Sequence, residues 1–188
     1  MVKRLLMGAA VVGLAVGPAS AGQQPPTAQK AQKTMSAKSP DETFMTKAAM
    51  GGMAEVDLGK LAVEKASSEE VKKFGQRMVD DHGKAGDELK TLAQSKNVTL
   101  PTELDANTKA LHDRLAKQSG PAFDRAYMQA MVADHKKDVN EFRTESKSGK
   151  DPETKAWASK TLPIIEEHLA LAQSTNSAVG TSGTKSPK

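Results

Sequence analysis

The spacing of apolar residues restricts this chain to helical folds. Between about residue 41 and residue 175 they recur at intervals of three and four, which is the period of an amphipathic α-helix. β-Branched residues are sparse in this part, and no stretch alternates apolar and polar residues as a half-buried strand does. The spacing therefore predicts an all-α fold with five helices, at about 41–66, 68–96, 102–118, 121–147 and 152–175.

Residues typical of helix starts support most of these boundaries. Three pairs have the spacing of a capping box or a close relative of it, namely Ser39 with Glu42, Ser67 with Glu70 and Thr102 with Asp105. Before the last helix, Asp151 and Pro152 are typical of an N-cap residue followed by proline in the first turn.

Four of the expected helices are long and one is short. Long amphipathic helices with short links predict a four-helix bundle, in which the short helix at 102–118 is a crossover between the second and third long helices. If this helix carries the chain back along the bundle, the long helices at 68–96 and 121–147 run parallel.

The first 21 residues have the pattern of a signal peptide. The basic start MVKR precedes an apolar run over 5–16, and the small residues at 19–21 are typical of a cleavage site. The apolar run is too short to span a membrane. We expect cleavage after Ala21 and a periplasmic or secreted protein with no membrane span.

Two further segments have no apolar period. Residues 22–40 and 176–188 are rich in small and polar residues, which is typical of disordered chain. We expect a disordered linker at 22–40, a single helical-bundle domain at 41–175 and a disordered tail at 176–188.

Composition excludes some sources of stability and some partners. The chain has no cysteine, so disulfide bonds cannot stabilise it, and its core, its partners or a ligand must do so. A nucleic-acid-binding protein is expected to carry a basic face with interleaved aromatic residues. Here the basic residues are scattered, and the aromatic residues are one Trp, one Tyr and four Phe. We therefore expect no nucleic-acid partner, and the sequence does not identify protein partners.

Three of the four histidines follow an acid in an otherwise apolar stretch. MVDDH ends at His82, MVADH ends at His135, and IIEEH ends at His168. At 100° per residue each histidine falls on the apolar face of its helix, and Glu55 takes the same position on the first helix. Counted from the connecting turns at about 1.5 Å per residue, the four side chains lie at similar heights. We expect them to meet in one layer.

This residue set has two interpretations. Three imidazoles and a carboxylate suit a transition-metal ion such as Zn, Fe or Cu, with Glu55, His82, His135 and His168 as ligands. Alternatively, a metal-free Glu–His layer satisfies its own polar groups and fixes the register of the helices. The sequence contains no phosphate-binding glycine-rich loop and no nucleophile elbow, so no organic cofactor is predicted.

Other polar and sulfur-containing residues lie near the expected layer. Five acids beside the histidines either orient the imidazoles or form a solvated flank: Asp80, Asp81, Asp134, Glu166 and Glu167. Asp124 and Tyr127 lie on the same face as His135 and could add hydrogen bonds or an oxygen ligand to the site. Alternatively, Asp124 favours the positive end of its helix and Tyr127 is a core residue. His112 is expected at the surface. Met78 and Met131 are copper-binding thioethers or core residues.

Several strings in a fixed order carry a resemblance to a known family. They are FMTKAAMGGMAEVDLGKLA, VKKFGQRMVDDH, LPTELD, SGPAFDRAYMQAMVADHKKDV and LPIIEEH. Over about residues 41–173 the chain resembles the exported bacterial family called domain of unknown function 4142. The resemblance implies a ferritin-like four-helix bundle in the cell envelope and carries no settled activity.

The wider ferritin-like group binds two metal ions through Glu-x-x-His pairs on two helices. Here the positions three residues before the histidines are apolar, being Val79, Val132 and Ile165. We therefore expect the site to bind a single metal ion. The expected role of the protein is metal handling or oxidative-stress protection. The alternative is a non-catalytic structural or stress-related envelope protein whose Glu–His layer only fixes helix register.

Overall fold

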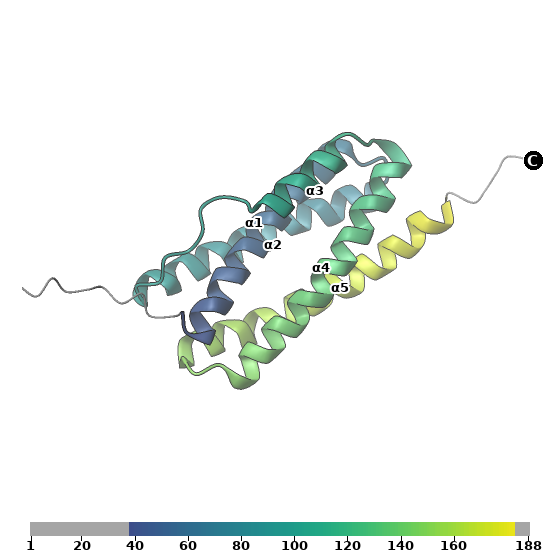
Figure 1. Cartoon of the computed structure of the whole chain (residues 1–188). Helices are drawn as coiled ribbons and strands as arrows, with labels where there is room; N and C mark the ends of the chain where they lie inside the picture. Colours follow the sequence, from purple (N-terminus) through teal and green to yellow (C-terminus); the bar gives the residue numbers. More distant parts are fainter. Residues whose placement is uncertain (1–37, 183–188) are drawn as a thin grey trace, which may run out of the picture. The chain divides into compact units, whose positions relative to one another are not determined.

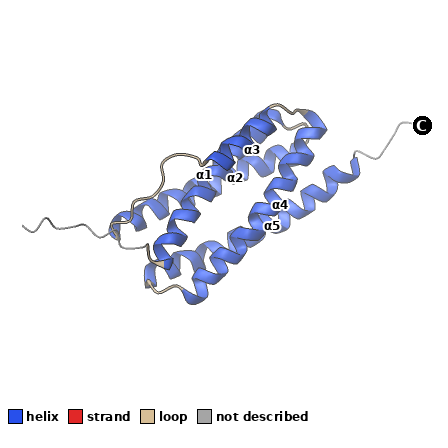
Figure 2. Cartoon of the chain, viewed as in Figure 1, coloured by secondary structure: helices blue, strands red, loops and turns tan. Residues whose placement is uncertain are grey.

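The computed structural model describes residues 38–182. The expected signal peptide, most of the expected linker and the end of the expected tail lie outside the described residues. The described part contains five helices: α1 (Pro40–Lys65), α2 (Glu69–Ser95), α3 (Ala106–Ala116), α4 (Gly120–Ser148) and α5 (Pro152–Ser182). Figure 2 shows helices and loops, with no strand between residues 38 and 182. The all-α prediction is confirmed.

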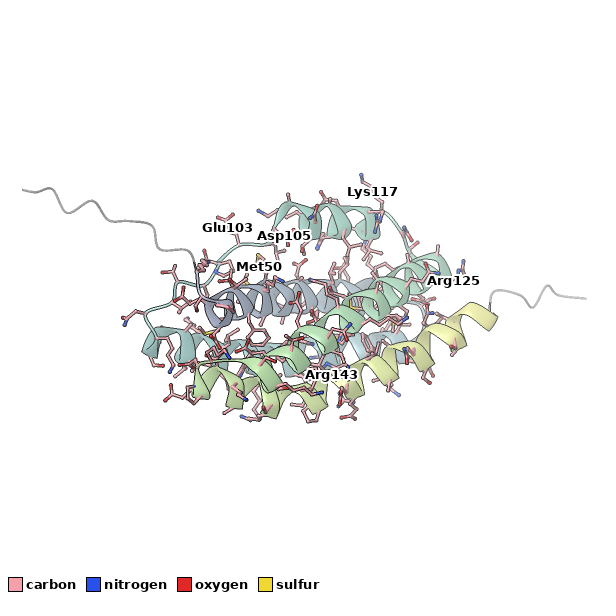
Figure 3. All side chains as sticks on the ribbon, turned by 60° about the horizontal axis from the view of Figure 1, so that its bottom comes forward. Met50, Glu103, Asp105, Lys117, Arg125 and Arg143 are labelled. Atoms are coloured by element: carbon pink, nitrogen blue, oxygen red, sulfur yellow. The ribbon has the colours of Figure 1, made fainter. Side chains whose placement is uncertain are left out.

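The four long helices form two antiparallel hairpins. α1 packs mainly on α2 and α4 mainly on α5, and the hairpins meet where α1 contacts α4 and α2 contacts α5 (Figure 1). The crossover helix α3 lies against α1, as Figure 3 shows between the labelled residues Asp105 and Lys117. The predicted four-helix bundle with a short crossover helix is confirmed.

Two sets of hydrogen bonds fix the direction of the hairpins. At one end, Asp124 near the start of α4 accepts hydrogen bonds from the backbone N–H groups of Ser67 and Ser68, between α1 and α2. At the other end, Asp41 in the first turn of α1 accepts from the N–H groups of Lys150 and Asp151, between α4 and α5. Because α2 and α4 begin at the same end of the bundle, they run parallel, as expected for a returning crossover.

The helix caps agree in part with those expected. The side chain of Ser39 accepts a hydrogen bond from the N–H of Glu42, and Asp151 accepts from that of Thr154. The cap of α2 is Ser68 rather than Ser67, because the hydroxyl of Ser67 donates to Asp124 instead.

The crossover helix α3 is shorter than expected. Its cap is Asp105, whose carboxylate accepts hydrogen bonds from the N–H groups of Asn107 and Thr108. This cap places the first helical residue after Asp105 rather than at residue 102.

Two apolar clusters make up the core, one toward each end of the bundle. One contains Leu58, Phe74, Met78, Tyr127 and Met131. The other contains Phe44, Leu89, Phe142 and Trp157. Burying a large apolar side chain stabilises a fold by about 1.5–3 kcal/mol, so these clusters supply most of the stabilisation. On α1 and α2 they flank Glu55 and His82, which places these polar residues near the middle of the bundle.

The last helix differs from expectation in two respects. It continues to Ser182, beyond residue 175, because Val179 is buried in the same cluster as Ala172 and gives the added turns an apolar face. In addition, the helical period puts Ile164, four residues before His168, on the inner face, yet Ile164 is 39% exposed, whereas Ile165 is 2% exposed. Both lie about one turn before His168, and the inner face follows the line of Ala158, Ile165 and Ala172.

None of the helices between residues 38 and 182 is both long enough and apolar enough to cross a membrane.

Candidate metal centre

Each long helix contributes one of the four expected residues, and the structure brings all four together. Glu55 comes from α1, His82 from α2, His135 from α4 and His168 from α5. Their exposed fractions are 1%, 6%, 0% and 0%, respectively. The centroids of the three imidazole rings lie 5.1–5.8 Å apart, and one ring nitrogen of each histidine lies within 4.8 Å of the others.

The carboxylate of Glu55 lies between two histidines. Its Oε2 is 2.9 Å from Nδ1 of His82, and its Oε1 is 3.2 Å from Nε2 of His135. The second contact is not aligned as a hydrogen bond, since Oε1 and Nε2 are both buried without a hydrogen-bond partner. Burial raises the pKa of Glu55 to about 8. A buried oxygen and a buried nitrogen therefore face each other without a bonding partner, which is costly.

The outer hydrogen bond of His135 determines which nitrogen carries the proton. Nδ1 of His135 lies 2.9 Å from the carbonyl oxygen of Met131, which can only accept, so Nδ1 is the donor. In the neutral ring the lone pair is then on Nε2, the atom directed at Glu55. This is how an outer hydrogen bond orients a metal-binding imidazole.

His168 has the same arrangement with its nitrogens exchanged. Its Nε2 lies 2.8 Å from Oδ2 of Asp81, and its Nδ1 lies 3.3 Å from Nε2 of His82. Burial acts to raise the pKa of Asp81, but hydrogen bonds from His168 and Arg77 outweigh it and lower the pKa overall. The carboxylate therefore accepts from Nε2–H, and the lone pair of His168 points inward on Nδ1.

Burial keeps the imidazoles neutral. It lowers the pKa of His82 and of His168 to about 4, and it also lowers the pKa of His135. Neutral imidazole is the form that coordinates a metal ion. Near pH 7 the layer thus presents lone pairs rather than charged rings.

Two aspartates from α4 extend the site beyond the four expected residues. One carboxylate oxygen each from Glu55, Asp134 and Asp138 lies within 4.8 Å of the others. Asp138 is 9% exposed, and burial raises its pKa to about 9. Sequence reasoning missed Asp138 as a site residue, although its place one turn after His135 on the same apolar face was a usable signal.

The other acids beside the histidines have different partners. Asp80 accepts from the side chain of Gln76, and Glu166 pairs with Arg143, which Figure 3 labels on α4. Glu167 pairs with Arg77 at 2.9 Å. Of the five acids, Asp81 contacts a histidine of the layer and Asp134 joins the carboxylate group, whereas these three belong to the solvated flank.

Three further polar residues considered in the sequence, Asp124, Tyr127 and His112, form no hydrogen bond or ion pair with the Glu–His layer. Asp124 holds the turn between α1 and α2. The ring of Tyr127 stacks on Phe123 with centroids 5.7 Å apart, and its hydroxyl is buried without a hydrogen-bond partner. His112, expected at the surface, is 35% exposed and pairs with Asp57 on α1 at 2.6 Å. It joins the crossover helix to the bundle.

The methionines beside the histidines belong to the apolar core. Met78 and Met131 are 0% and 1% exposed in the cluster around Phe74. Met131 contacts His135 through its carbonyl oxygen. This placement agrees with the core interpretation of both residues.

A cavity of about 710 Å³ reaches the layer from the side of α1 and α2. Glu55, His82 and Asp138 line it, and so do apolar residues of α2 and of the loop before α3. Its size lies within the range of small-ligand sites, about 300–1,000 Å³. The candidate centre is buried but has a route to the surface.

The chain belongs to the family described as domain of unknown function (DUF4142), whose model matches residues 24–175. Among curated proteins, no sequence matches the chain significantly.

Several solved structures share the fold at low sequence identity. CopM in the Cu(II)-bound form is 18% identical with a TM-score of 0.62, covering 73% of this chain and 96% of CopM. CopM in a silver-bound form is 20% identical with a TM-score of 0.59, covering 71% and 93%. A DUF305 fragment from Deinococcus radiodurans is 10% identical with a TM-score of 0.65, covering 77% and 98%. At these identities the likeness concerns the fold.

Proposed function

We propose that this member of the DUF4142 family is a metal-handling protein of the cell envelope that binds a single transition-metal ion inside the bundle. The ligands are one side chain from each long helix: Glu55, His82, His135 and His168. Metal handling here means holding or transferring the ion, or keeping it from oxidative side reactions.

One observation carries this proposal. Oε1 of Glu55 and Nε2 of His135 are buried, lie 3.2 Å apart and have no hydrogen-bond partner. Buried polar atoms without a partner are rare because each costs about 1–3 kcal/mol. A cation bound to both atoms would remove that cost.

The donor set fits the first-row metals. Imidazole nitrogen suits Zn, Fe and Cu, and carboxylate oxygen binds all three. Copper is the first ion to test, because CopM, which has a similar fold, has been solved with Cu(I), Cu(II) and silver bound. When bound, copper supplies one-electron redox chemistry, whereas zinc supplies a Lewis acid.

The chain's own groups prepare the site. The Met131 carbonyl and the Asp81 carboxylate hold two imidazoles with their lone pairs inward. Glu55 supplies a carboxylate oxygen once a bound ion displaces its proton. The surrounding core excludes water, apart from the cavity that leads to Glu55 and His82.

Metal analysis of the purified full chain tests this function. We expect one equivalent of bound Cu²⁺ or Zn²⁺, lost in His82→Ala and in Glu55→Gln. His112→Ala is the matched control, since His112 pairs with Asp57 outside the layer. A folded chain that binds no metal at neutral pH would overturn the proposal.

A metal-free layer that fixes helix register is the second candidate function. Its supporting observation is the chain of contacts from Asp81 through His168 and His82 to Glu55, which needs no ion. In that case His82→Ala lowers the free energy of unfolding by the same amount with and without added metal. For a metal site, the difference between the chains grows with metal concentration.

Export to the envelope is part of the proposal. It rests on the signal-peptide pattern of the first 21 residues, which lie outside the described part of the chain. N-terminal sequencing of the protein recovered from the periplasm tests it, with Gly22 as the expected first residue. An intact Met1 in the recovered protein would contradict export by cleavage.

A further inference from the structure

We propose that the bundle holds a second cation site, built from carboxylates, beside the histidine layer. The coordinating residues are Glu55, Asp134 and Asp138, and the expected bound ion is a hard divalent cation of the Mn²⁺ or Mg²⁺ class. The inference goes beyond the proposed function, because two of the three ligands, Asp134 and Asp138, lie outside the histidine layer and the site prefers a different kind of metal ion.

The geometry is that of a three-oxygen cluster. One carboxylate oxygen from each residue lies within 4.8 Å of the other two, across the contact between α1 and α4. Oxygen ligands select hard cations, whereas the adjacent imidazoles select softer ones. Oε2 of Glu55 lies near His82, and its Oε1 lies near His135. The carboxylate of Glu55 therefore belongs both to the histidine layer and to the carboxylate cluster.

Two of these carboxyl groups are buried without partners. Asp138 is 9% exposed and, among the described residues, forms no hydrogen bond or ion pair. Oε1 of Glu55, in a side chain 1% exposed, has no hydrogen-bond partner either. Acid clusters at a protein surface are common without a cation, but a buried unpartnered carboxyl group is costly. Asp138 therefore points to a ligand.

The surroundings leave room for an ion and its water. Both oxygens of Asp138 lie 3.8–3.9 Å from the position that a Cβ of Gly51 would take, so the absent side chain keeps this side open. The 710 Å³ cavity reaches Asp138 and Glu55 from one side. A second cavity of about 440 Å³, lined by residues of α1, α3 and α4, reaches Asp134 under the start of α3, where Figure 3 labels Asp105. Mn²⁺ and Mg²⁺ keep several waters, which three protein ligands allow.

The lack of a basic partner also argues for a second ion. Lys137 lines the cavity beside Asp134, but it forms no ion pair with either aspartate among the described residues. A divalent cation held by the three residues would displace their carboxyl protons and pair with the resulting carboxylates.

Mn²⁺ is the probe, because it binds imidazole weakly and has a characteristic electron paramagnetic resonance signal. Titrating the full chain with Mn²⁺ should remove one equivalent of the free-ion signal. Asp138→Asn should abolish this binding, and Asp80→Asn, which changes an acid on the solvated flank of α2, should not. Mn²⁺ that stays free with the unaltered chain, or that still binds to Asp138→Asn, would overturn the proposal.

A second set of variants separates this site from the histidine layer. His168→Ala removes a residue that contacts His82 and Asp81, not the carboxylate group. It should reduce Cu²⁺ or Zn²⁺ binding and leave Mn²⁺ binding intact, whereas Asp138→Asn should do the reverse. Thermal unfolding of each variant checks that it is folded. If His168→Ala abolished Mn²⁺ binding in a folded chain, the separate carboxylate site would be refuted, while the histidine site would stand.

Discussion

Asp81 on α2 accepts a hydrogen bond from Nε2 of His168 on α5 at 2.8 Å, although in the sequence it directly precedes a different histidine, His82. Arg77, one turn earlier, donates to the same Oδ2 at 3.1 Å and pairs with Glu167 at 2.9 Å. The orientation of a histidine in one hairpin is thus set by an acid in the other. The acid before His82 thus acts on a histidine of another helix rather than on its own neighbour.

This relationship predicts that Asp81→Ala lowers metal affinity without removing a ligand. Loss of the outer acceptor frees His168 to rotate and to change its protonated nitrogen, and such outer groups are typically worth about 10–100-fold in affinity. Competition with a chelator of known affinity measures the change. Asp80→Ala is the control, because Asp80 bonds to Gln76 on the exposed side of α2. Equal affinities in the two variants would contradict the orienting role.

A second prediction concerns stability alone. Asp124, 3% exposed, accepts hydrogen bonds from the N–H groups of Ser67 and Ser68 and from the Ser67 hydroxyl. Asp124→Ala leaves these donors without a partner, and we expect a loss of about 3 kcal/mol in the free energy of unfolding. Urea denaturation measures it, and Asp124→Asn, which keeps one acceptor oxygen, should lose less. Metal content per folded chain should not change, whereas a ligand role for Asp124 would require it to fall.

The sequence was sufficient for the parts of the site that depend on a single helix. Glu55 and the three histidines each interrupt an apolar stripe, so helical period alone identifies their inward positions. Likewise Ser39 and Asp151 cap helices from within their own segments. Features that depend on two helices meeting were not predictable in this way.

Asp124 illustrates the limit. Its partners lie more than fifty residues earlier in the chain, and nothing in its own helix indicates them. Ile164 and Ile165 both lie one turn before His168, and the rotation of α5 against its neighbours decides which is buried. Helical period from His135 puts Asp138 on the inner face of its helix, but its grouping with Glu55 follows from the contact between α1 and α4.

A third prediction is a dependence of stability on pH that does not involve the layer. Burial, together with the hydrogen bond to Asp41, raises the pKa of Glu145 from 4.5 to about 7. The folded chain therefore binds this proton more tightly than the unfolded chain does. The stabilisation is complete below about pH 4.5 and is lost as the pH rises through about 7.

Glu145→Gln isolates this effect, because the amide still donates to Asp41 but does not titrate. Denaturation curves at several pH values between 4.5 and 8 give the difference in unfolding free energy between the two chains. We expect the unaltered chain to lose stability relative to Glu145→Gln as the pH rises. A difference that is constant over this range would show that the proton on Glu145 is not held by the fold.

The last prediction concerns a close approach of two helices. A Cβ at Gly75 on α2 would lie 2.8 Å from Cβ of Ala62 and 2.8 Å from the carbonyl oxygen of Gly59, both on α1. Gly75→Ala must therefore push α1 and α2 apart, and overpacking of this kind costs about 1–3 kcal/mol. The same displacement separates Glu55 from His82, which are 2.9 Å apart, so we expect weaker metal binding as well.

Gly83→Ala is the matched control, since it makes the same change on the same helix. A Cβ at Gly83 meets no atom within 4 Å, so the alanine should stabilise α2 by up to about 1 kcal/mol through helix propensity. Thermal unfolding should show a loss of stability in Gly75→Ala and a gain in Gly83→Ala. Chelator competition should show a loss of metal affinity in Gly75→Ala alone. If Gly75→Ala bound metal as tightly as the unaltered chain, the close packing of α1 on α2 would not be what holds Glu55 against His82.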